Sequence, residues 1–316
     1  MRLLRPLSQR FHRLSPPTQG ALYMTAAAFF FALMNTCVRL AADANLHPTE
    51  IAFFRNFFAF LFMLPWLIGT RMRGLRTKRF VGHVWRAMIG VCSMLLWFAS
   101  VAALPMAQAV ALNFTFPLFA TILAALILKE DVRLRRWSAT VIGFLGVLVI
   151  LQPWDAAVAW SSALPVAAAL FMAVSATMVK SLSRTEAPGT MVAYMNLLMT
   201  PMALVPALFF WTWPDWQTLG YLVVLGFFAA VSHIALTRAY VTADASAIQP
   251  FDYLRLPFIA AIAYFLFDEV PDEWLWVGAA IIAGATLYIA HREAQVVRQR
   301  KAAQLGAAPS GPSPAA

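Results

Sequence analysis

The sequence predicts an all-α membrane protein, and three features of its 316 residues support this fold class. First, 61% of the residues are hydrophobic and only 12% are charged, which is more apolar surface than a soluble core can bury. Second, apolar runs of about 18 to 25 residues recur along the chain, and each matches a hydrocarbon layer about 30 Å thick. Third, the alternating segments of about ten residues that are typical of membrane β-barrels do not recur. Because a spanning backbone must satisfy its own hydrogen bonds, helices are expected.

The apolar runs predict ten membrane-spanning helices with short connections. Their expected ranges are 20–41, 49–69, 82–103, 107–128, 135–151, 160–182, 189–211, 217–240, 244–267 and 273–291. The first run is longer than the roughly 7 to 15 residues of a signal-peptide core, so we expect it to remain as a span. A basic leader over residues 1–17 and a tail over residues 293–316, which ends in GAAPSGPSPAA, are expected to be disordered or bound to the membrane surface.

The distribution of Lys and Arg predicts the orientation of these helices. The basic residues that flank the helices gather at one set of ends: Arg2, Arg5, Arg10, Arg13, Arg71, Arg73, Arg76, Lys78, Arg79, Lys129, Arg133, Arg135, Arg136, Arg298, Arg300 and Lys301. The opposite loops carry carboxylates, such as Asp155, Asp215 and Asp272. Since basic loops stay in the cytoplasm, both termini are expected there, in a multi-pass protein of the bacterial inner membrane. The net charge of +10 then reflects topology and anionic lipid rather than nucleic-acid binding.

The chain also repeats itself at a constant offset, the one that separates Glu130 from Glu269. LILKEDVRLRRW, which ends at Trp137, aligns at this offset with YFLFDEVPDEWLW, which ends at Trp276. Each half contains five expected helices, and because five is odd the second half enters the membrane from the opposite side. This pattern predicts two inverted-topology repeats over residues 18–152 and 158–292. Inverted repeats are typical of transporters, whose substrate sites lie near the midplane where the halves meet.

Two charged residues lie deep in the ninth expected helix. Asp252 lies about eight residues from its cytoplasmic end, at a depth of about 12 Å. Arg255 follows three residues later on the same helix face, and Pro250 and Pro257 flank the pair. Ionisable groups at this depth usually mark a substrate or ion path, although these two could instead neutralise each other and fix the packing. Pro257 is expected to kink the helix and to leave backbone carbonyls near Tyr253 unpaired.

Two further residues are expected at the same centre. The offset between the repeats aligns Asp252 with Asn113, so the two halves are expected to direct a carboxylate and an amide toward one point. Asn113 could instead make an interhelical hydrogen bond. Trp97 lies too deep for the interfacial aromatic belt, and we expect its ring to stack on a planar or cationic group, with core packing as the alternative. Tyr253, beside Asp252, is expected to serve the opposite wall or a neighbouring helix.

Charged residues nearer the helix ends have other expected roles. Arg55, about six residues into the second helix, is expected to contact a substrate anion near the outer entrance. A carbonyl or a carboxylate, from Glu50 or Asp43, could instead neutralise it. Glu130 and Glu269 end their helices at opposite faces and are expected to act as gate or capping residues.

The histidines and cysteines predict no metal site and no cofactor. His233 is the only histidine deep in an expected span, and it could be a packing residue or a proton relay. The other four histidines are scattered along the chain. Cys37 and Cys92 both fall within expected spans and fit neither a disulfide framework nor metal-ligand spacing. A membrane-embedded enzyme is therefore a weakly supported alternative, because it needs a catalytic constellation.

Several motifs together resemble a known family over residues 20–292. TEIAFFRNFF, RAMIGVCSMLLWF, FPLFATILAALILKE, RWSATVIGFLGVLVILQP and DASAIQPFDYL look like the EamA branch of the drug/metabolite transporter superfamily. The resemblance is greatest to the S-adenosylmethionine uptake carriers of bacteria, which implies S-adenosylmethionine as the first substrate to consider. Riboflavin-like compounds, amino acids and their derivatives are the alternatives. Where those carriers tend to show Arg-Tyr-Leu-Glu after the proline, this chain has Asp252, Tyr253, Leu254 and Arg255.

These observations predict a secondary transporter that moves a small polar or zwitterionic metabolite by alternating access. The chain has no Walker motif, so ATP is not expected to power transport directly, and a channel is the remaining alternative. Arg255 stabilises the ionised form of Asp252, which favours exchange or uniport over proton symport. Small residues at Gly143, Gly146, Gly278 and Gly284 predict close helix contacts, either within the monomer or across a homodimer.

Overall fold

The computed structural model describes residues 14–69, 75, 77–126, 134–152, 159–182, 185–186, 188–243, 248 and 251–306, and these residues contain helices and no strand. The helices are α2 (Pro16–Asp43), α3 (Pro48–Gly69), α4 (Phe80–Ala103), α5 (Met106–Asn113), α6 (Phe116–Leu126), α7 (Leu134–Leu151), the 3₁₀ turn η3 (Trp160–Ser162), α8 (Ala163–Leu182), α9 (Pro188–Ala207), α10 (Trp216–Thr242), α12 (Arg255–Phe267) and α13 (Glu273–Gly306). Six of them, α2, α3, α4, α8, α9 and α10, are long and apolar enough to cross a membrane. The protein is therefore a multi-pass membrane protein.

The outer surface of the bundle is apolar, as lipid contact requires. Leu145 on α7 is 51% exposed and Phe265 on α12 is 80% exposed. A soluble protein rarely shows a contiguous apolar surface of this kind. The helices are thus apolar on most sides, and the buried positions are enriched in alanine, which lets the helix backbones approach closely.

The fourth expected helix is interrupted, which the sequence did not predict, and the ninth is interrupted near the expected kink. Residues 114 and 115 form a turn between α5 and α6, and residues 253 and 254 form a turn before α12. Both turns are tight: the Thr115 amide donates to the Leu112 carbonyl at 3.2 Å, and the Leu254 amide donates to the Phe251 carbonyl at 3.3 Å. These i to i+3 bonds are the 3₁₀ kind that replaces an α-helical turn. The two interruptions are separated by the offset of the repeat, so they fall at equivalent points of the two halves.

The carbonyl near the second interruption is paired, which corrects the expectation for Tyr253. Its carbonyl oxygen accepts a hydrogen bond from the Leu256 amide at 3.1 Å. The chain tightens at this point, so the carbonyl finds a nearer donor when Pro257 cannot supply one. The kink is present, but it does not expose that carbonyl.

The helix contacts repeat when the two halves of the chain are exchanged. At the offset of the repeat, α2, α3, α4 and α7 correspond to α8, α9, α10 and α13. The packing of α2 against α10 is matched by that of α8 against α4, and the packing of α10 against α3 by that of α4 against α9. The pairs α3 with α9 and α7 with α13 correspond to themselves. The two halves therefore pack as equivalent units around a common centre.

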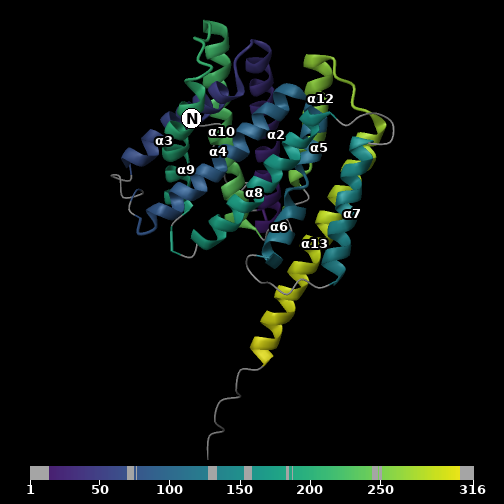
Figure 1. Ribbon diagram of the computed structural model, residues 1–316. Helices are drawn as coiled ribbons and strands as arrows, with labels where there is room; N and C mark the ends of the chain where they lie inside the picture. The colour runs from purple at the N-terminus through teal and green to yellow at the C-terminus, as the bar shows by residue number, and fades with distance from the viewer. Residues whose placement is uncertain are drawn as a thin grey trace, which may run out of the picture.

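Helices α7 and α13 lie side by side at one edge of the bundle (Figure 1). Two glycines permit this contact: a Cβ atom at Gly278 would lie 2.6 Å from the Gly146 carbonyl oxygen. A Cβ atom at Gly143 would lie 2.6 Å from the side chain of Leu118, whereas Gly284 has no atom within 4 Å of such a position. Of the two possibilities left by the sequence, contact within one chain therefore applies to Gly146 and Gly278.

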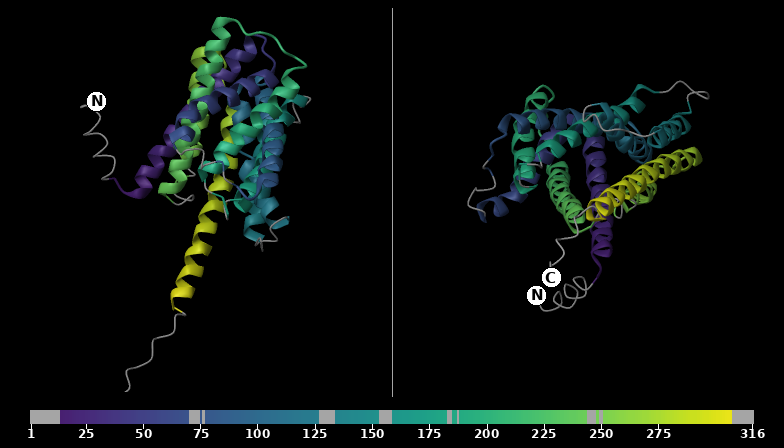
Figure 2. Two further views of the ribbon diagram at one scale, coloured as in Figure 1. Left: turned by 90° about the vertical axis from the view of Figure 1, so that its left-hand side faces the viewer. Right: turned by 90° about the horizontal axis from the view of Figure 1, so that it is seen from below.

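Helix α13 extends beyond the predicted end of the tenth span. It continues to Gly306, so residues 293–306, which the sequence predicts to be disordered, are helical. Figures 1 and 2 show this part projecting past the other helices. Its residues REAQVVRQRKAAQLG are rich in Ala, Gln and Arg, which have high helix propensity, so a helix that begins in the bundle can continue here.

Candidate functional site

Five side chains, four of them from α2, α3, α10 and α12, form a connected group, which we call the central cluster: Asp252, Arg255, Phe31, His233 and Arg55. Asp252, just before α12, pairs with Arg255 at its start. The Arg255 guanidinium carbon lies 4.7 Å from the ring centroid of Phe31 on α2. That ring meets the ring of His233 on α10 edge to face, with centroids 5.3 Å apart. His233 Nε2 in turn lies 2.7 Å from Nη2 of Arg55 on α3.

Arg55 is a buried cation held by uncharged groups. Its side chain is 6% exposed, and Nη1 donates to Asn56 Oδ1 at 2.9 Å. Because a guanidinium has only donors, His233 Nε2 must accept from Nη2, which fixes the histidine as neutral with its proton on Nδ1. Asn56 is fully buried and donates through Nδ2 to the Ala52 carbonyl at 2.9 Å, so the amide that orients Arg55 is itself held in place.

The carboxylates considered as partners of Arg55 bind other groups. Glu50 accepts from the Thr212 amide at 2.7 Å, and Asp43 pairs with Arg39 at 3.2 Å. Among the described residues, no carboxylate lies within 4.0 Å of Arg55. The central cluster therefore contains two guanidinium groups and one carboxylate, which is an excess of one positive charge.

The pair of Asp252 and Arg255 is less enclosed. The Asp252 side chain is 31% exposed and the Arg255 side chain is 16% exposed. Nε of Arg255 is buried and has no hydrogen-bond partner among the described residues. Asp252 and Arg255 thus neutralise each other, which was one of the two possibilities left by the sequence. The Arg255 Nε can still donate a hydrogen bond, and the Asp252 carboxylate can still accept one.

Trp97 and Asn113 each have a polar partner on another helix. Trp97 Nε1 donates to Oδ1 of Asn35 on α2 at 3.2 Å, which orients the indole ring. Asn113 Nδ2 donates to the Pro165 carbonyl on α8 at 3.2 Å, which is the interhelical bond left open by the sequence. Phe114 and Tyr253, which directly follow Asn113 and Asp252, are in contact: their rings pack edge to face with centroids 4.8 Å apart. The two helix interruptions are therefore in direct contact.

A second polar group joins the halves at one end of the bundle. Glu269 accepts from the Met106 amide at 2.8 Å, at the start of α5, and its other oxygen lies 3.6 Å from Arg39 Nη2. Arg39 Nη1 also donates to the Leu104 carbonyl at 3.0 Å. Glu269 thus caps a helix of the first half while it belongs to the second. Glu130, its aligned counterpart, lies outside the described residues.

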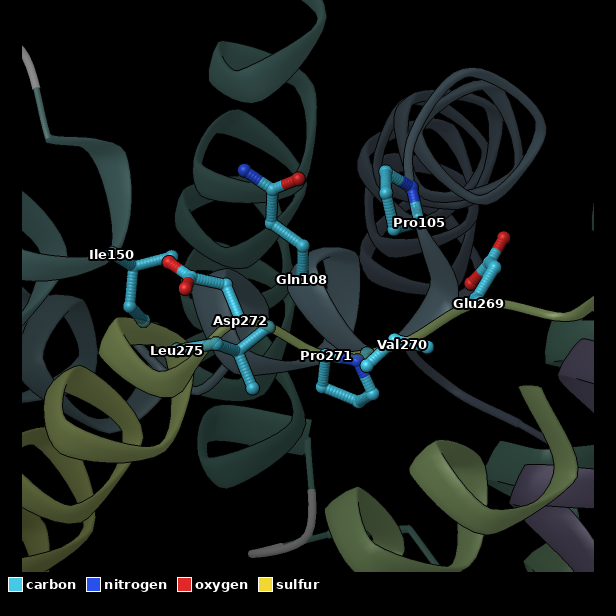
Figure 3. Close-up of a pocket in the computed structure, with 9 residues that line it drawn as sticks. Pro105, Gln108, Ile150, Glu269, Val270, Pro271, Asp272 and Leu275 are labelled. Carbon is cyan, nitrogen blue, oxygen red and sulfur yellow. The ribbon is translucent and has the colours of Figure 1, made fainter. Parts of the chain in front are cut away.

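A pocket lies beside this group, between the start of α5, the end of α7 and the segment that joins α12 to α13. Its volume is about 170 Å³, and Gln108, Glu269 and Asp272 contribute its polar lining. Figure 3 shows the two carboxylates at opposite ends of the segment, with Val270 and Pro271 between them. Ligand pockets usually measure about 300 to 1,000 Å³, so this pocket does not enclose a metabolite of ordinary size. No group of three His, Cys, Asp or Glu side chains suited to a metal ion occurs among the described residues.

Phe31 and Arg39 are functional candidates that the sequence analysis missed. Phe31 lies four residues before Asn35, so both occupy one face of α2. A polar residue in the middle of a span indicates the inward face, and that signal was available for Phe31. Arg39 lies on the same face another four residues along, where the helix end suggests nothing more specific than an interfacial residue.

The chain matches a family model described as the EamA-like transporter family twice, over residues 18–152 and 159–290. It is 39% identical over 290 residues to a riboflavin transporter of Vibrio cholerae, covering 90% of this chain and 97% of the relative. It is 32% identical over 271 residues to an S-adenosylmethionine uptake transporter of Rickettsia prowazekii, covering 86% of this chain and 92% of the relative. A crystal structure with 16% sequence identity matches with a TM-score of 0.61, over 86% of this chain and 97% of the other, which supports the fold alone.

Proposed function

This chain belongs to the EamA-like transporter family, and we propose that it carries a riboflavin-type flavin across the bacterial inner membrane. The family match covers both halves, and members of a transporter family move solutes rather than catalyse reactions. Riboflavin transporters from three bacteria are 39%, 37% and 35% identical to it. The relatives named for S-adenosylmethionine are less similar, at 30% to 32% identity.

The excess positive charge of the central cluster supports a flavin over S-adenosylmethionine. Arg55 is buried without a carboxylate partner in the described part of the chain, and Asp252 is paired with Arg255. S-adenosylmethionine has a sulfonium, an ammonium and one carboxylate, so its net charge is positive and it would be repelled. Riboflavin is uncharged at neutral pH, and its planar ring offers carbonyl and ring-nitrogen acceptors. Buried donors favour such acceptors, because an unsatisfied buried guanidinium is costly.

Aromatic side chains around the cluster suit a planar substrate. Phe31 and His233 belong to the cluster, and the Trp97 ring is held beside α2 by Asn35. Stacking on such rings contributes about 0.5 to 1.5 kcal/mol beyond the area that is buried. We assign substrate contacts to Arg55, Asp252, Arg255 and Trp97. Asn113 and Tyr253 are assigned to the wall around them, since each contacts a residue of the other half of the chain.

Alternating access follows from the arrangement of the two halves. We propose that they are inverted repeats with both termini in the cytoplasm, and that rocking of one half on the other exposes the central cluster to each side in turn. The contact between Phe114 and Tyr253 supports a pivot at the two helix interruptions. Glu269 and Arg39 hold the outer ends of the halves together, and we assign them to the outer gate, with Glu130 in the corresponding place at the inner gate.

Transport is proposed to be exchange or facilitated passage. Asp252 pairs with Arg255, and His233 Nε2 accepts from Arg55, so both candidate proton carriers already bind a cation. Transfer of a proton in each cycle would require these contacts to break. An uncoupler of the proton gradient should therefore leave uptake unchanged while the substrate gradient is kept.

Uptake in cells that lack their own flavin uptake tests the substrate directly. Cells that make this protein and control cells are given labelled riboflavin or labelled S-adenosylmethionine at the same concentration. The proposal predicts saturable riboflavin uptake, with little S-adenosylmethionine uptake above the control. Uptake of S-adenosylmethionine alone would contradict it and would restore the substrate suggested by the sequence motifs.

A further inference from the structure

We infer that the central cluster binds its substrate in one orientation, with the flavin ring edge at Arg55 and the hydroxyl-bearing chain at Asp252 and Arg255. This inference rests on the proposed function and adds to it the part of the substrate that each residue recognises. It also assigns a role to His233 and Phe31, which are a positioning residue and a spacer between the two halves of the site.

The Arg55 half of the site offers donors only. A guanidinium has five N–H groups, and the structure uses one for Asn56 and one for His233. The remaining N–H groups need acceptors, and the described residues supply none at this position. The pyrimidine edge of a flavin presents carbonyl oxygens and ring nitrogens in one plane. A planar donor fork therefore matches this edge better than it matches a chain of hydroxyl groups.

His233 positions the guanidinium rather than binding the substrate itself. Its Nε2 accepts from Arg55 at 2.7 Å, and its ring is fixed edge to face against Phe31. If the histidine took up a proton at Nε2, the acceptor would be lost and a cation would face Arg55. Arg255, a second cation, also contacts the Phe31 ring. Neutral His233 thus supplies the acceptor that keeps Arg55 in place.

The Asp252 half of the site offers both acceptors and a donor. The carboxylate uses one oxygen for Arg255 and is 31% exposed, so it can accept from a ligand. Nε of Arg255 is buried without a hydrogen-bond partner in the described residues, so it can donate. Hydroxyl groups both donate and accept, and a run of them along a flexible chain satisfies this pair.

Phe31 holds the two halves of the site within reach of one molecule. Its ring centroid is 4.7 Å from the Arg255 guanidinium carbon and 5.3 Å from the His233 ring centroid, so a single aromatic ring bridges these two groups. A flavin with an extended side chain is longer than one such ring and can reach both halves. The ring also separates Arg255 from the Arg55 half, which limits repulsion between the two cations.

A matched pair of flavins tests the orientation. Riboflavin and lumiflavin share the ring system, but lumiflavin has a methyl group in place of the hydroxyl-bearing chain. The Kd of each is measured from flavin fluorescence with the purified full-length protein in detergent. We expect wild type to prefer riboflavin, because only riboflavin reaches both halves of the site.

Three substitutions should change this preference in different ways. Asp252→Asn should bring the two Kd values together by weakening riboflavin and leaving lumiflavin within about twofold. Arg55→Gln should weaken both flavins by about tenfold or more and leave their ratio unchanged. His233→Ala should behave like Arg55→Gln, whereas His233→Gln keeps an acceptor and should recover much of the loss. The ratio of the two Kd values does not depend on how much of a variant is folded.

Distinct results would overturn the orientation. The proposed orientation is wrong if Asp252→Asn leaves the ratio of the two Kd values unchanged or abolishes lumiflavin binding. It is also wrong if Arg55→Gln changes this ratio without weakening both flavins. His233→Gln that binds no better than His233→Ala would remove the role given to that histidine. If wild type binds riboflavin and these ratios fail, only the orientation is refuted. If wild type binds neither flavin, the proposed function is refuted and the orientation with it.

Discussion

Arg55 is the residue on which the proposed function depends most. A charged side chain inside a membrane bundle is costly unless it is paired or serves a pathway. Arg55 is 6% exposed, and in the described part of the chain it has an amide and an imidazole as partners but no carboxylate. A packing role alone would be served better by an apolar side chain of similar volume. The retained charge therefore indicates a ligand that supplies acceptors.

Replacing Arg55 with lysine tests whether its planar geometry matters. A lysine ammonium keeps the charge but cannot present two parallel N–H groups to one planar edge. Arg55→Lys should raise the KM of riboflavin uptake by about tenfold, because hydrogen bonds to charged groups contribute about 1.5 to 3 kcal/mol. Arg86→Lys is the matched control, since Arg86 is another enclosed arginine and donates to the Met191 carbonyl at 2.8 Å. An equal rise in KM for both variants would contradict a specific role for Arg55.

Asn113 should behave as a packing residue despite its alignment with Asp252. Its amide donates to the Pro165 carbonyl on α8. Asn113→Ala should lower the melting temperature in detergent slightly, because interhelical hydrogen bonds in membranes contribute about 0.6 kcal/mol. The riboflavin KM should stay within about twofold of wild type, since a lost packing contact leaves the substrate contacts in place. A large rise in KM with an unchanged melting temperature would move Asn113 into the binding site.

The charged residues of the candidate site could be selected from the sequence, whereas most of their contacts could not. Hydropathy alone identifies Arg55, Asp252 and Arg255, because charges interrupt apolar spans. The spacing of three also predicts the pair that Asp252 and Arg255 form. The bond between Arg55 and His233 joins residues 178 positions apart, so no local pattern could reveal it.

At the scale of helices, the pattern of small residues identifies contacts but not their location. Gly146 and Gly278 bring the backbones of α7 and α13 together, and Gly284 on α13 meets nothing within 4 Å. A small residue in the sequence therefore corresponds to a close helix contact at some glycines and to no contact at others. Burial decides between them, and burial depends on how the helices are rotated, which composition alone does not fix.

These glycines provide a matched pair of substitutions on one helix. Gly278→Val places a side chain against the Gly146 carbonyl oxygen and Ile150, so α7 and α13 must separate. Overpacking of this kind costs about 1 to 3 kcal/mol, and the melting temperature in detergent should fall by several degrees. Gly284→Val adds the same atoms where there is open space and should leave the melting temperature near that of wild type. Equal effects of the two substitutions would refute the close contact of α7 and α13.

Two of the expected spans, 107–128 and 244–267, contain helix interruptions that hydropathy does not report. Hydropathy responds to the mean apolar character of a long window, and residues 107–128 and 244–267 remain apolar on average despite the polar residues at their interruptions. The turns at residues 114–115 and 253–254 keep their backbone bonded through i to i+3 hydrogen bonds, so each segment stays compact although its α-helix is broken. Proline indicated the second interruption, and the first lies two residues before Pro117.

At the scale of the whole molecule, the outer gate is proposed to open when Glu269 releases Arg39 and the start of α5. Glu269→Ala removes both contacts, so the outer ends of the two halves should separate more often. A single cysteine at Gln108, in a chain whose Cys37 and Cys92 are replaced by alanine, reports this opening from the edge of the pocket. Its labelling by a membrane-impermeant maleimide should become several-fold faster in the Glu269→Ala background. An unchanged or slower rate would mean that Glu269 does not close this side.

The equivalence of the two halves was predictable from the repeated motifs, and the contact pattern of the helices agrees with it. What the sequence could not provide is the geometry at their meeting point. Phe114 and Tyr253 occupy aligned positions and contact each other, which requires both halves to be assembled. The central cluster likewise takes residues from α2, α3, α10 and α12, so it exists only in the folded bundle.

Counterflow in proteoliposomes tests most directly the claim that this protein is a flavin carrier with alternating access. Vesicles that contain the purified protein are loaded with unlabelled riboflavin and diluted into a trace of labelled riboflavin. A carrier must return with substrate bound, so the account predicts transient accumulation of label above its external concentration, and less accumulation with Arg55→Gln. Label that only equilibrates, without saturation or overshoot, would indicate a channel, and vesicles that take up no label would contradict the flavin assignment.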